Sequence, residues 1–548
     1  MKKLFVLIIS LYHLTGFGQN YYLTVTGLKE NETKTIDSIG YQQKFTKESL
    51  ILDEVNQLTE QLQKKGYLEC QIISNSKAND STHHYQFELK KRIDFIHIYI
   101  GDKWKLISET KSDTIKMRFH ESETYLINIS KKIENKGFSI SKVQLKNITK
   151  KNNSLIAELF IELDTKRVVN NIIINGYDKF PEGFKKNILK KHRNKTFNKE
   201  SLEKISNDFK SISFVKQTKY PEILFNPDTT KVYVYIEKKK NNYFDGFLGF
   251  SNSDKKLILN GYVDLSLNNI LNTGDEFSIK WRSDGKDQKN FNLDIELPFV
   301  FKSPIGLKLQ LNIFKQDSTF QNSKTDINLG YYLNNKSKIY VGYQSTESSD
   351  IGNLNSTLLN DFNNYFFTSS FDFKNSKEDL LFPEKSSLNL KIGYGKRESK
   401  IDSSNQFSGS INFNYVLDLN KKNSLYVSSH NYFLQSDSYL INELFRFGGI
   451  KSIRGFKENS LQGSQANLIL TEYRYRFSPN FYMHSIVDYG YYKDNSTESS
   501  NNPLGVGIGF GLLNNGGKLN FIYANGIDNK QVVKLSNSII HISFKSYF

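Results

Sequence analysis

The sequence predicts α+β modules followed by a C-terminal transmembrane antiparallel β-barrel of about 16 strands. From Tyr243 to the end of the 548 residues, segments of about ten alternating apolar and polar residues recur between Asn, Asp, Ser and Gly, which is typical of barrel strands. Aromatic residues make up 14% of the chain, with 41 Phe and 32 Tyr, enough to supply lipid-facing girdles. Before Tyr243, helical stripes and short strands alternate, which indicates small mixed modules.

We assign the barrel to residues 242–548. In one of its segments Leu307, Leu309 and Leu311 alternate with Lys308 and Gln310, so apolar side chains would face lipid and polar ones the lumen. A soluble two-sheet sandwich also alternates, but there the apolar face would be the packed core. About 300 residues is large for one sandwich, and the aromatic-rich segment ends favour lipid.

The N-terminus has the features of a secretory signal peptide, which we assign to residues 1–18. Lys2 and Lys3 precede an apolar run that ends at Leu14, and small residues follow up to Gly18. A short transmembrane anchor is the alternative, but the run is too short to span a bilayer. Only Cys70 is present, so we expect no disulfide framework.

Three modules of about 75 residues are expected next, at residues 19–92, 93–167 and 168–241. The third is the clearest, since a strand, two helices and two strands follow one another. Its second predicted helix, residues 199–212, places Leu202, Ile205 and Phe209 on one face. In the first module, Val55, Leu58 and Leu62 form the buried stripe of a helix predicted over residues 46–65.

The longest gap between alternating segments, residues 437–466, predicts a long loop on the sheet, and loops of this length are usually functional or disordered. Its centre reads FGGIKSIRGF. Glycines allow close backbone approach and arginine offers a rigid fork of donors, so a structured loop is expected. The residues that we single out are Gly448, Gly449, Ile453, Arg454, Gly455 and Phe456.

Ile453 to Phe456 resemble the loop signature of the BamA and TamA superfamily, outer-membrane barrels that carry periplasmic POTRA domains. The spacing of Gly176, Pro181 and Phe184 is similar to that of the family's last POTRA domain. The terminal Phe548 resembles the recognition signal of outer-membrane barrels in general. The resemblance implies that the loop tip folds back into the lumen, where its arginine pairs with acidic residues on the next two strands.

Alternation identifies such partners in this chain. Glu472 lies on the polar face of one segment, and Asp488 lies on the inner face of the next, together with Gly490. Val487 to Gly490 resemble the family's Asp-x-Gly strand. Because a buried guanidinium is costly unless it is paired, we predict that Arg454 pairs with Glu472 and Asp488. Glycines alternate near the C-terminus, from Gly505 to Gly511, and would leave room for the loop.

The sequence offers little for catalysis, cofactors or nucleic acid. It contains no GxSxG nucleophile elbow, and His83 and His84 would point to opposite faces of a strand, so we predict no enzyme activity, no metal site and no cofactor. The net charge of +17 is spread along the chain. We therefore interpret it as a solvated face or a contact with anionic lipid head groups, and not as a nucleic-acid site.

The resemblance implies a Gram-negative outer-membrane protein whose modules lie in the periplasm and receive unfolded outer-membrane or secreted polypeptides. The barrel would insert these clients into the membrane or translocate them across it, with accessory periplasmic or lipoprotein subunits as further partners. Two alternatives stay open: a dedicated two-partner secretion pore, and a porin-like barrel without a client.

Overall fold

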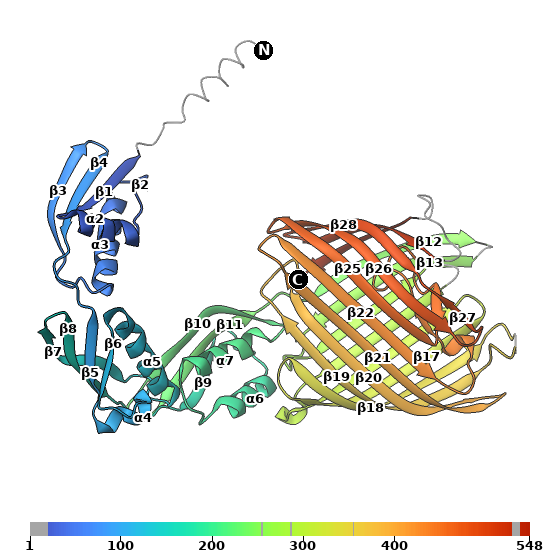
Figure 1. Ribbon diagram of the computed structural model, residues 1–548. Coiled ribbons are helices and arrows are strands. Elements are labelled where there is room, and N and C mark those ends of the chain that lie inside the picture. Colours follow the sequence, from blue (N-terminus) through green and yellow to red (C-terminus); the bar gives the residue numbers. More distant parts are fainter. Residues whose placement is uncertain (1–19, 254–255, 285–287, 354–355, 529–537) are drawn as a thin grey trace, which may run out of the picture. The chain divides into compact units, whose positions relative to one another are not determined.

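The computed structural model describes residues 20–253, 256–284, 288–353, 356–528 and 538–548 (Figure 1). The predicted signal peptide lies outside these residues. The chain divides into two compact units, Met1–Val168 with Lys195–Lys199, and Val169–Asn194 with Glu200–Phe548. Among the described residues, no helix combines the length and the apolar character that a membrane span requires.

The first unit contains two α+β modules with the same sheet plan, in which the first strand pairs in parallel with the last. In the first module the sheet order is β2-β1-β4-β3, and the predicted stripe of Val55, Leu58 and Leu62 is buried. In the second module the order is β6-β5-β8-β7. The elements of the first module are β1 (Tyr21–Gly27), α2 (Glu30–Ile39), β2 (Lys44–Phe45), α3 (Ser49–Lys64), β3 (Gln71–Asn79) and β4 (Thr82–Glu88). Those of the second are β5 (Phe95–Tyr99), η1 (Asp102–Trp104), α4 (Lys105–Ser108), β6 (Thr114–Arg118), η2 (Phe119–Glu121), α5 (Ser122–Asn135), β7 (Lys142–Lys151) and β8 (Ser154–Glu162).

The third module belongs to the second unit and has the sheet order β10-β11-β9. Its elements are β9 (Val169–Asn175), α6 (Glu182–His192), α7 (Lys199–Lys210), β10 (Val215–Phe225) and β11 (Thr230–Lys238). Leu202, Ile205 and Phe209 of α7 are buried, as their helical spacing predicts. The helix ends at Lys210, two residues before the predicted end.

The rest of the second unit is a closed antiparallel barrel of 16 strand positions in the described residues, because β27 and β28 both pair with β26 and share one position. This confirms the predicted fold class. The wall consists of β12 (Tyr243–Ser253), β13 (Lys256–Asn268), β14 (Glu276–Ser283), β15 (Gln288–Leu297), β16 (Ile305–Gln316), β17 (Phe320–Tyr332), β18 (Ser337–Asp350), β19 (Phe362–Ser376), β20 (Glu384–Ser399), β21 (Ser403–Asp418), β22 (Asn423–Gln435), β25 (Gln465–Ser478), β26 (Phe481–Asp494), β27 (Ser499–Asn501), β28 (Leu504–Asn514), β29 (Gly517–Ile527) and β30 (Ile539–Tyr547).

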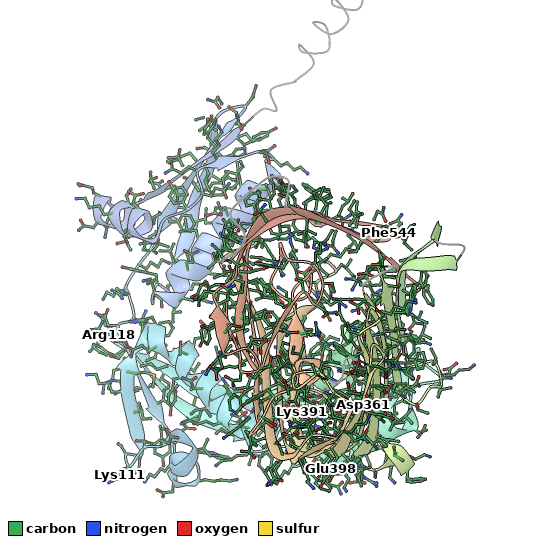
Figure 2. The ribbon with its side chains drawn as sticks, turned by 90° about the vertical axis from the view of Figure 1, so that its right-hand side faces the viewer. Lys111, Arg118, Asp361, Lys391, Glu398 and Phe544 are labelled. Atoms are coloured by element: carbon green, nitrogen blue, oxygen red, sulfur yellow. The ribbon has the colours of Figure 1, made fainter. Side chains whose placement is uncertain are left out.

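The two faces of the barrel wall differ in the way that alternation predicts. On β17, Ile327 and Leu329 are exposed on the outer face, while Asp326 and Asn328 are buried inside. Figure 2 labels Lys391, which donates within the lumen to Gln344 at 3.1 Å, and Phe544, which is exposed on β30. An apolar exterior around a polar interior is the reverse of a soluble sandwich, so the barrel interpretation holds.

The barrel closes where β12 meets β30, and this seam is short. Two residue pairs join the described parts of these strands, Tyr243 with Tyr547 and Phe244 with Ser546, whereas eleven pairs join β12 to β13. The amide of Phe548 adds a hydrogen bond of 3.0 Å to the carbonyl of Asn242. Because ladder hydrogen bonds hold adjacent strands together, the seam is the weakest junction in the wall.

The third module is docked on the barrel through an aromatic contact. The ring of Phe184 on α6 meets that of Phe299 edge to face, with the centroids 4.6 Å apart. Phe299 lies at the start of the β15–β16 connection with a φ of 52°. Gly274, in the β13–β14 connection, leaves the space that Phe184 fills, since a Cβ there would lie 2.1 Å from the Phe184 ring. Tyr177 accepts a hydrogen bond of 2.6 Å from Asn269.

We predict that Phe299→Ala loosens this joint by about 3 kcal/mol, or about a hundredfold in the docking equilibrium, because it removes a buried aromatic contact. Trypsin should then cut faster at Lys239 and Lys240, between the third module and β12. The matched control is Phe301→Ala, in the same connection at a similar φ of 54° but 96% exposed, which should leave cleavage unchanged. Equal cleavage rates in the two variants would contradict the role of Phe299 in docking the third module on the barrel.

Candidate functional site

The long predicted loop is a structured element inside the barrel. It runs from the end of β22 to the start of β25, and it contains η4 (Ile441–Glu443) and a small hairpin of β23 (Phe445–Phe447) and β24 (Leu461–Gly463). Gly448 and Gly449 turn the chain after β23 with φ values of 108° and 97°, which side chains rarely allow.

The tip of the loop packs against the inner wall. Ile453 and Phe456 are buried in a cluster with Phe447, Ala466 and Leu468. Gly455 has a φ of 89°, and a Cβ there would lie 2.3 Å from the backbone of Asn525 on β29. The tip therefore requires glycine for both its conformation and its close approach to the wall.

Arg454 is 3% exposed and reaches two carboxylates on adjacent strands. Its Nη2 lies 2.6 Å from Oδ1 of Asp488, and its Nε lies 2.7 Å from Oδ2 of the same carboxylate. Its Nη1 donates to Glu472. The Arg454 amide also donates to Asp488 at 3.0 Å. A buried guanidinium is stable only with such pairing, so these contacts hold the tip in place.

Neighbouring residues orient the two carboxylates and make room for the tip. Arg474 donates to Glu472 at 2.7 Å through its Nε. Gly490 follows Asp488 on the inner face, where a Cβ would lie 2.7 Å from Leu468. A Cβ on Gly505 would lie 2.2 Å from the carbonyl oxygen of Arg454. Of the alternating glycines of β28, Gly505 leaves space for the loop, whereas Gly507, Gly509 and Gly511 face residues of the wall, such as Tyr523, His484 and Tyr482.

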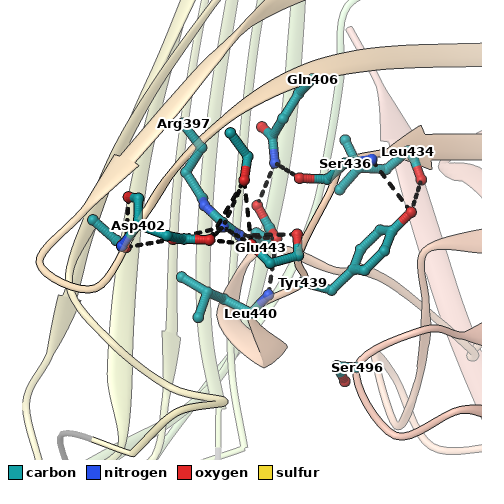
Figure 3. Close-up of polar contacts among 12 residues, drawn as sticks. Arg397, Asp402, Gln406, Leu434, Ser436, Tyr439, Leu440, Glu443 and Ser496 are labelled. Carbon is teal, nitrogen blue, oxygen red and sulfur yellow. Dashed lines mark hydrogen bonds and ion pairs between the residues drawn. The ribbon is translucent and has the colours of Figure 1, made fainter.

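The structure also reveals a second arginine cluster, which the sequence analysis did not single out (Figure 3). Arg397, near the end of β20, is fully buried. Its Nη1 donates to Glu443 of η4 at 2.5 Å, and its Nη2 donates to both carboxylate oxygens of Asp402 at 2.8 and 2.9 Å. Gln406 donates to the second oxygen of Glu443 at 2.7 Å. Gly393, Gly395 and Arg397 alternate on the inner face of β20. This alternation is the sequence signal that could have identified Arg397 as an inward-facing residue.

The same short helix is also held by the neighbouring strands β17 and β18 and by the β18–β19 connection. The Nδ2 of Asn442 donates to Ser348 at 2.7 Å and to the carbonyl of Asn360 at 2.8 Å. Asn322 on β17 in turn donates to the carbonyl of Asn442 at 2.6 Å. The first arm of the loop is thereby fixed to the contiguous strands β17 to β21, and its anchor uses other residues than the tip does.

Comparison with known proteins supports the fold. A family model described as haemolysin secretion/activation protein ShlB/FhaC/HecB matches residues 394–512, a segment that contains both arginine clusters. The solved structure of CdiB from Acinetobacter baumannii is 14% identical, with 91% of this chain and 98% of that chain covered and a TM-score of 0.51. The chain has the fold of a POTRA-bearing outer-membrane barrel. This confirms the resemblance to the BamA and TamA superfamily that the loop signature indicated.

Two further solved structures are similar to this chain. CdiB from Escherichia coli is 13% identical, with 91% of this chain and 98% of that chain covered and a TM-score of 0.51. BamA from Haemophilus ducreyi lacking POTRA domains 1-3 is 15% identical, with 81% and 96% covered and a TM-score of 0.46. No curated protein sequence matches this chain. In the described residues, no three His, Cys, Asp or Glu side chains converge in a way that could hold a metal ion.

We predict that Arg454→Ala releases the loop tip while the barrel stays folded. The variant leaves the buried Asp488 without its cation and Glu472 with Arg474 alone, at a cost of about 3 kcal/mol, which corresponds to about a hundredfold faster local opening. Hydrogen–deuterium exchange over residues 448–456 measures this opening. Lys451→Ala, in the same loop but with an exposed side chain, serves as the charge-matched control. Unchanged exchange in Arg454→Ala would refute the anchoring role.

For the second cluster we predict energetic coupling between Arg397 and Glu443. Arg397→Met should lower the free energy needed to open η4 by about 3 kcal/mol, because it leaves the carboxylate of Glu443 buried without its cation. In Arg397→Met/Glu443→Gln most of this loss should be recovered, which gives a coupling energy of about 2 kcal/mol in a double-mutant cycle. Hydrogen exchange at residues 438–443 provides the readout. Additive effects would exclude the ion pair as the anchor.

Proposed function

We propose that this chain transports polypeptide clients at the outer membrane of a Gram-negative bacterium. The POTRA-like modules, at residues 19–92, 93–167 and 168–241, would lie in the periplasm and receive an extended client, which the barrel would pass across or into the membrane. The observation that carries the proposal is the anchored loop inside the lumen. A pore for free diffusion needs an open lumen, whereas a transporter needs a closure that can be released.

The modules offer edges to which an extended client could add as a further strand. In the first module β3 is an edge strand, and all nine of its residues are exposed, including Ile72 and Ile73. In the second module the edge strand β7 is interrupted by a register shift between Lys146 and Thr149. The edge strand β3 has two such shifts, between Ile72 and Ser74 and between Lys77 and Asn79, so both edges remain candidates for receiving a client.

We favour export of a secreted partner as the specific role. The family model that matches the loop and its strands describes haemolysin secretion and activation proteins, and it supports a dedicated exporter. Insertion of other barrel proteins into the membrane is the second candidate. The two-pair seam between β12 and β30 favours that role, since a weak junction could open sideways to lipid.

The test is to deplete the protein and compare the outer-membrane and secreted proteomes. Loss of one secreted protein is the expected result and would identify a dedicated exporter, whereas a broad loss of barrel proteins would identify an insertion factor. An unchanged proteome, combined with a large and steady conductance of the purified protein in planar bilayers, would refute transport of polypeptides. Copurification after crosslinking would reveal any accessory periplasmic or lipoprotein subunits.

A further inference from the structure

A cavity of about 340 Å³ lies at the end of the barrel to which the third module is joined. Its lining comes from the β19–β20 connection, the β21–β22 connection and the inner face of β25. In an antiparallel barrel that begins with β12 at the third module, these two connections return to that same end. Lys210 of α7 lies 3.7 Å from Glu378 in the β19–β20 connection, which agrees with this placement.

The cavity faces the lumen and not the surrounding lipid. The β19–β20 connection folds inward, so that Leu381 and Phe382 are buried. The ring of Phe382 packs edge to face on Tyr482 of the inner wall, with the centroids 4.6 Å apart. The guanidinium of Arg474 lies over the other side of this connection, 4.5 Å from the Phe382 centroid. The head groups of the bilayer around the barrel are therefore not its natural occupant.

The lining is strongly cationic. Five of its side chains are Lys or Arg and two are carboxylates, so its net formal charge is +3. Both carboxylates are already engaged: Asp379 accepts from Arg476 at 2.5 Å, and Asp418 accepts from Lys377 at 2.9 Å.

The remaining cations, Lys421 and Lys422, are exposed at the tip of the β21–β22 connection. Among the described residues, neither side chain has a carboxylate partner within ion-pair distance. Arg474 lies deeper and shares Glu472 with Arg454. The cavity thus combines an aromatic wall, a rigid arginine and two unpaired lysines, which together suit a carboxylate on a flexible chain.

We propose that this cavity binds acidic segments of the client polypeptide as they enter the barrel. The proposal rests on the proposed transport function and names a substrate chemistry for it. Asp and Glu side chains of an extended segment pair with Lys421 and Lys422. Charge complementarity at an entrance raises the local concentration of the matching segment and selects against basic ones.

The test uses the purified full-length protein in detergent and three fluorescent twelve-residue peptides: one rich in Asp and Glu, its Asn and Gln counterpart, and a Lys-rich version. Fluorescence anisotropy should detect binding of the acidic peptide, with an affinity that falls as salt rises. Lys421→Glu/Lys422→Glu should weaken this binding about tenfold or more, because two attractions become repulsions. Lys289→Glu/Lys493→Glu changes two exposed lysines outside the cavity and should retain wild-type affinity. The different electrophoretic mobilities of the folded and heated barrel check that each variant is folded.

Equal affinity for the acidic and neutral peptides would overturn the proposal. So would acidic binding that both double variants weaken alike, since that would reflect the general positive charge of the chain. Full competition by millimolar phosphate or acetate would also overturn it, because the cavity would then bind small anions and not a polypeptide. These outcomes are independent of the proteome experiment: binding can fail in a chain that exports a client, and it can succeed in a chain that exports none.

Discussion

The buried ion pairs of Arg454 are the interaction on which the arrangement of the lumen depends. A guanidinium and two carboxylates have been removed from water, and each of these groups would be strongly unfavourable there alone. Together they form a network with two parallel hydrogen bonds to Asp488 and one to Glu472. The network fixes one position of the loop tip, because any displacement of about one ångström would break several charged hydrogen bonds at once.

The loop is anchored twice, and the two anchors have opposite polarity. At the tip the cation belongs to the loop and the carboxylates to the wall, whereas at η4 the cation is Arg397 of the wall and the carboxylate is Glu443 of the loop. The two anchors cannot exchange places. The loop cation Arg454 would then face the wall cation Arg397, and the loop carboxylate Glu443 would face the carboxylates of the wall. This arrangement specifies the register of the loop, and it allows one arm to be released while the other stays in place.

The ion-pair anchors of the loop and the weak seam lie on different strands of the wall. The loop and its anchors occupy the inner face of β20, β25 and β26, while the weak seam lies between β12 and β30. The third module is packed against the β13–β14 and β15–β16 connections, which follow β12 closely along the chain. The loop also reaches strands on both sides of the seam, since Glu458 accepts from Arg282 on β14 at 2.7 Å and Gly455 lies against Asn525 on β29.

Much of this organisation follows from the sequence alone, because the relevant signals are local. Alternation with a period of two predicts the barrel and places Glu472 and Asp488 on the inner face, and helical periodicity predicts the buried stripes of α3 and α7. The glycines around Arg454 and along β28 likewise indicate where the backbone must come close. Only the closed tertiary structure brings Arg397 to Glu443 and gathers the cations around Phe382, since these residues lie on segments far apart in the sequence. Their proximity depends on the curvature of the barrel and on the inward fold of its connections. Neither feature leaves a periodic signal, so the sequence determined the strands and their inner faces, and the closure of the barrel decided which inner faces meet.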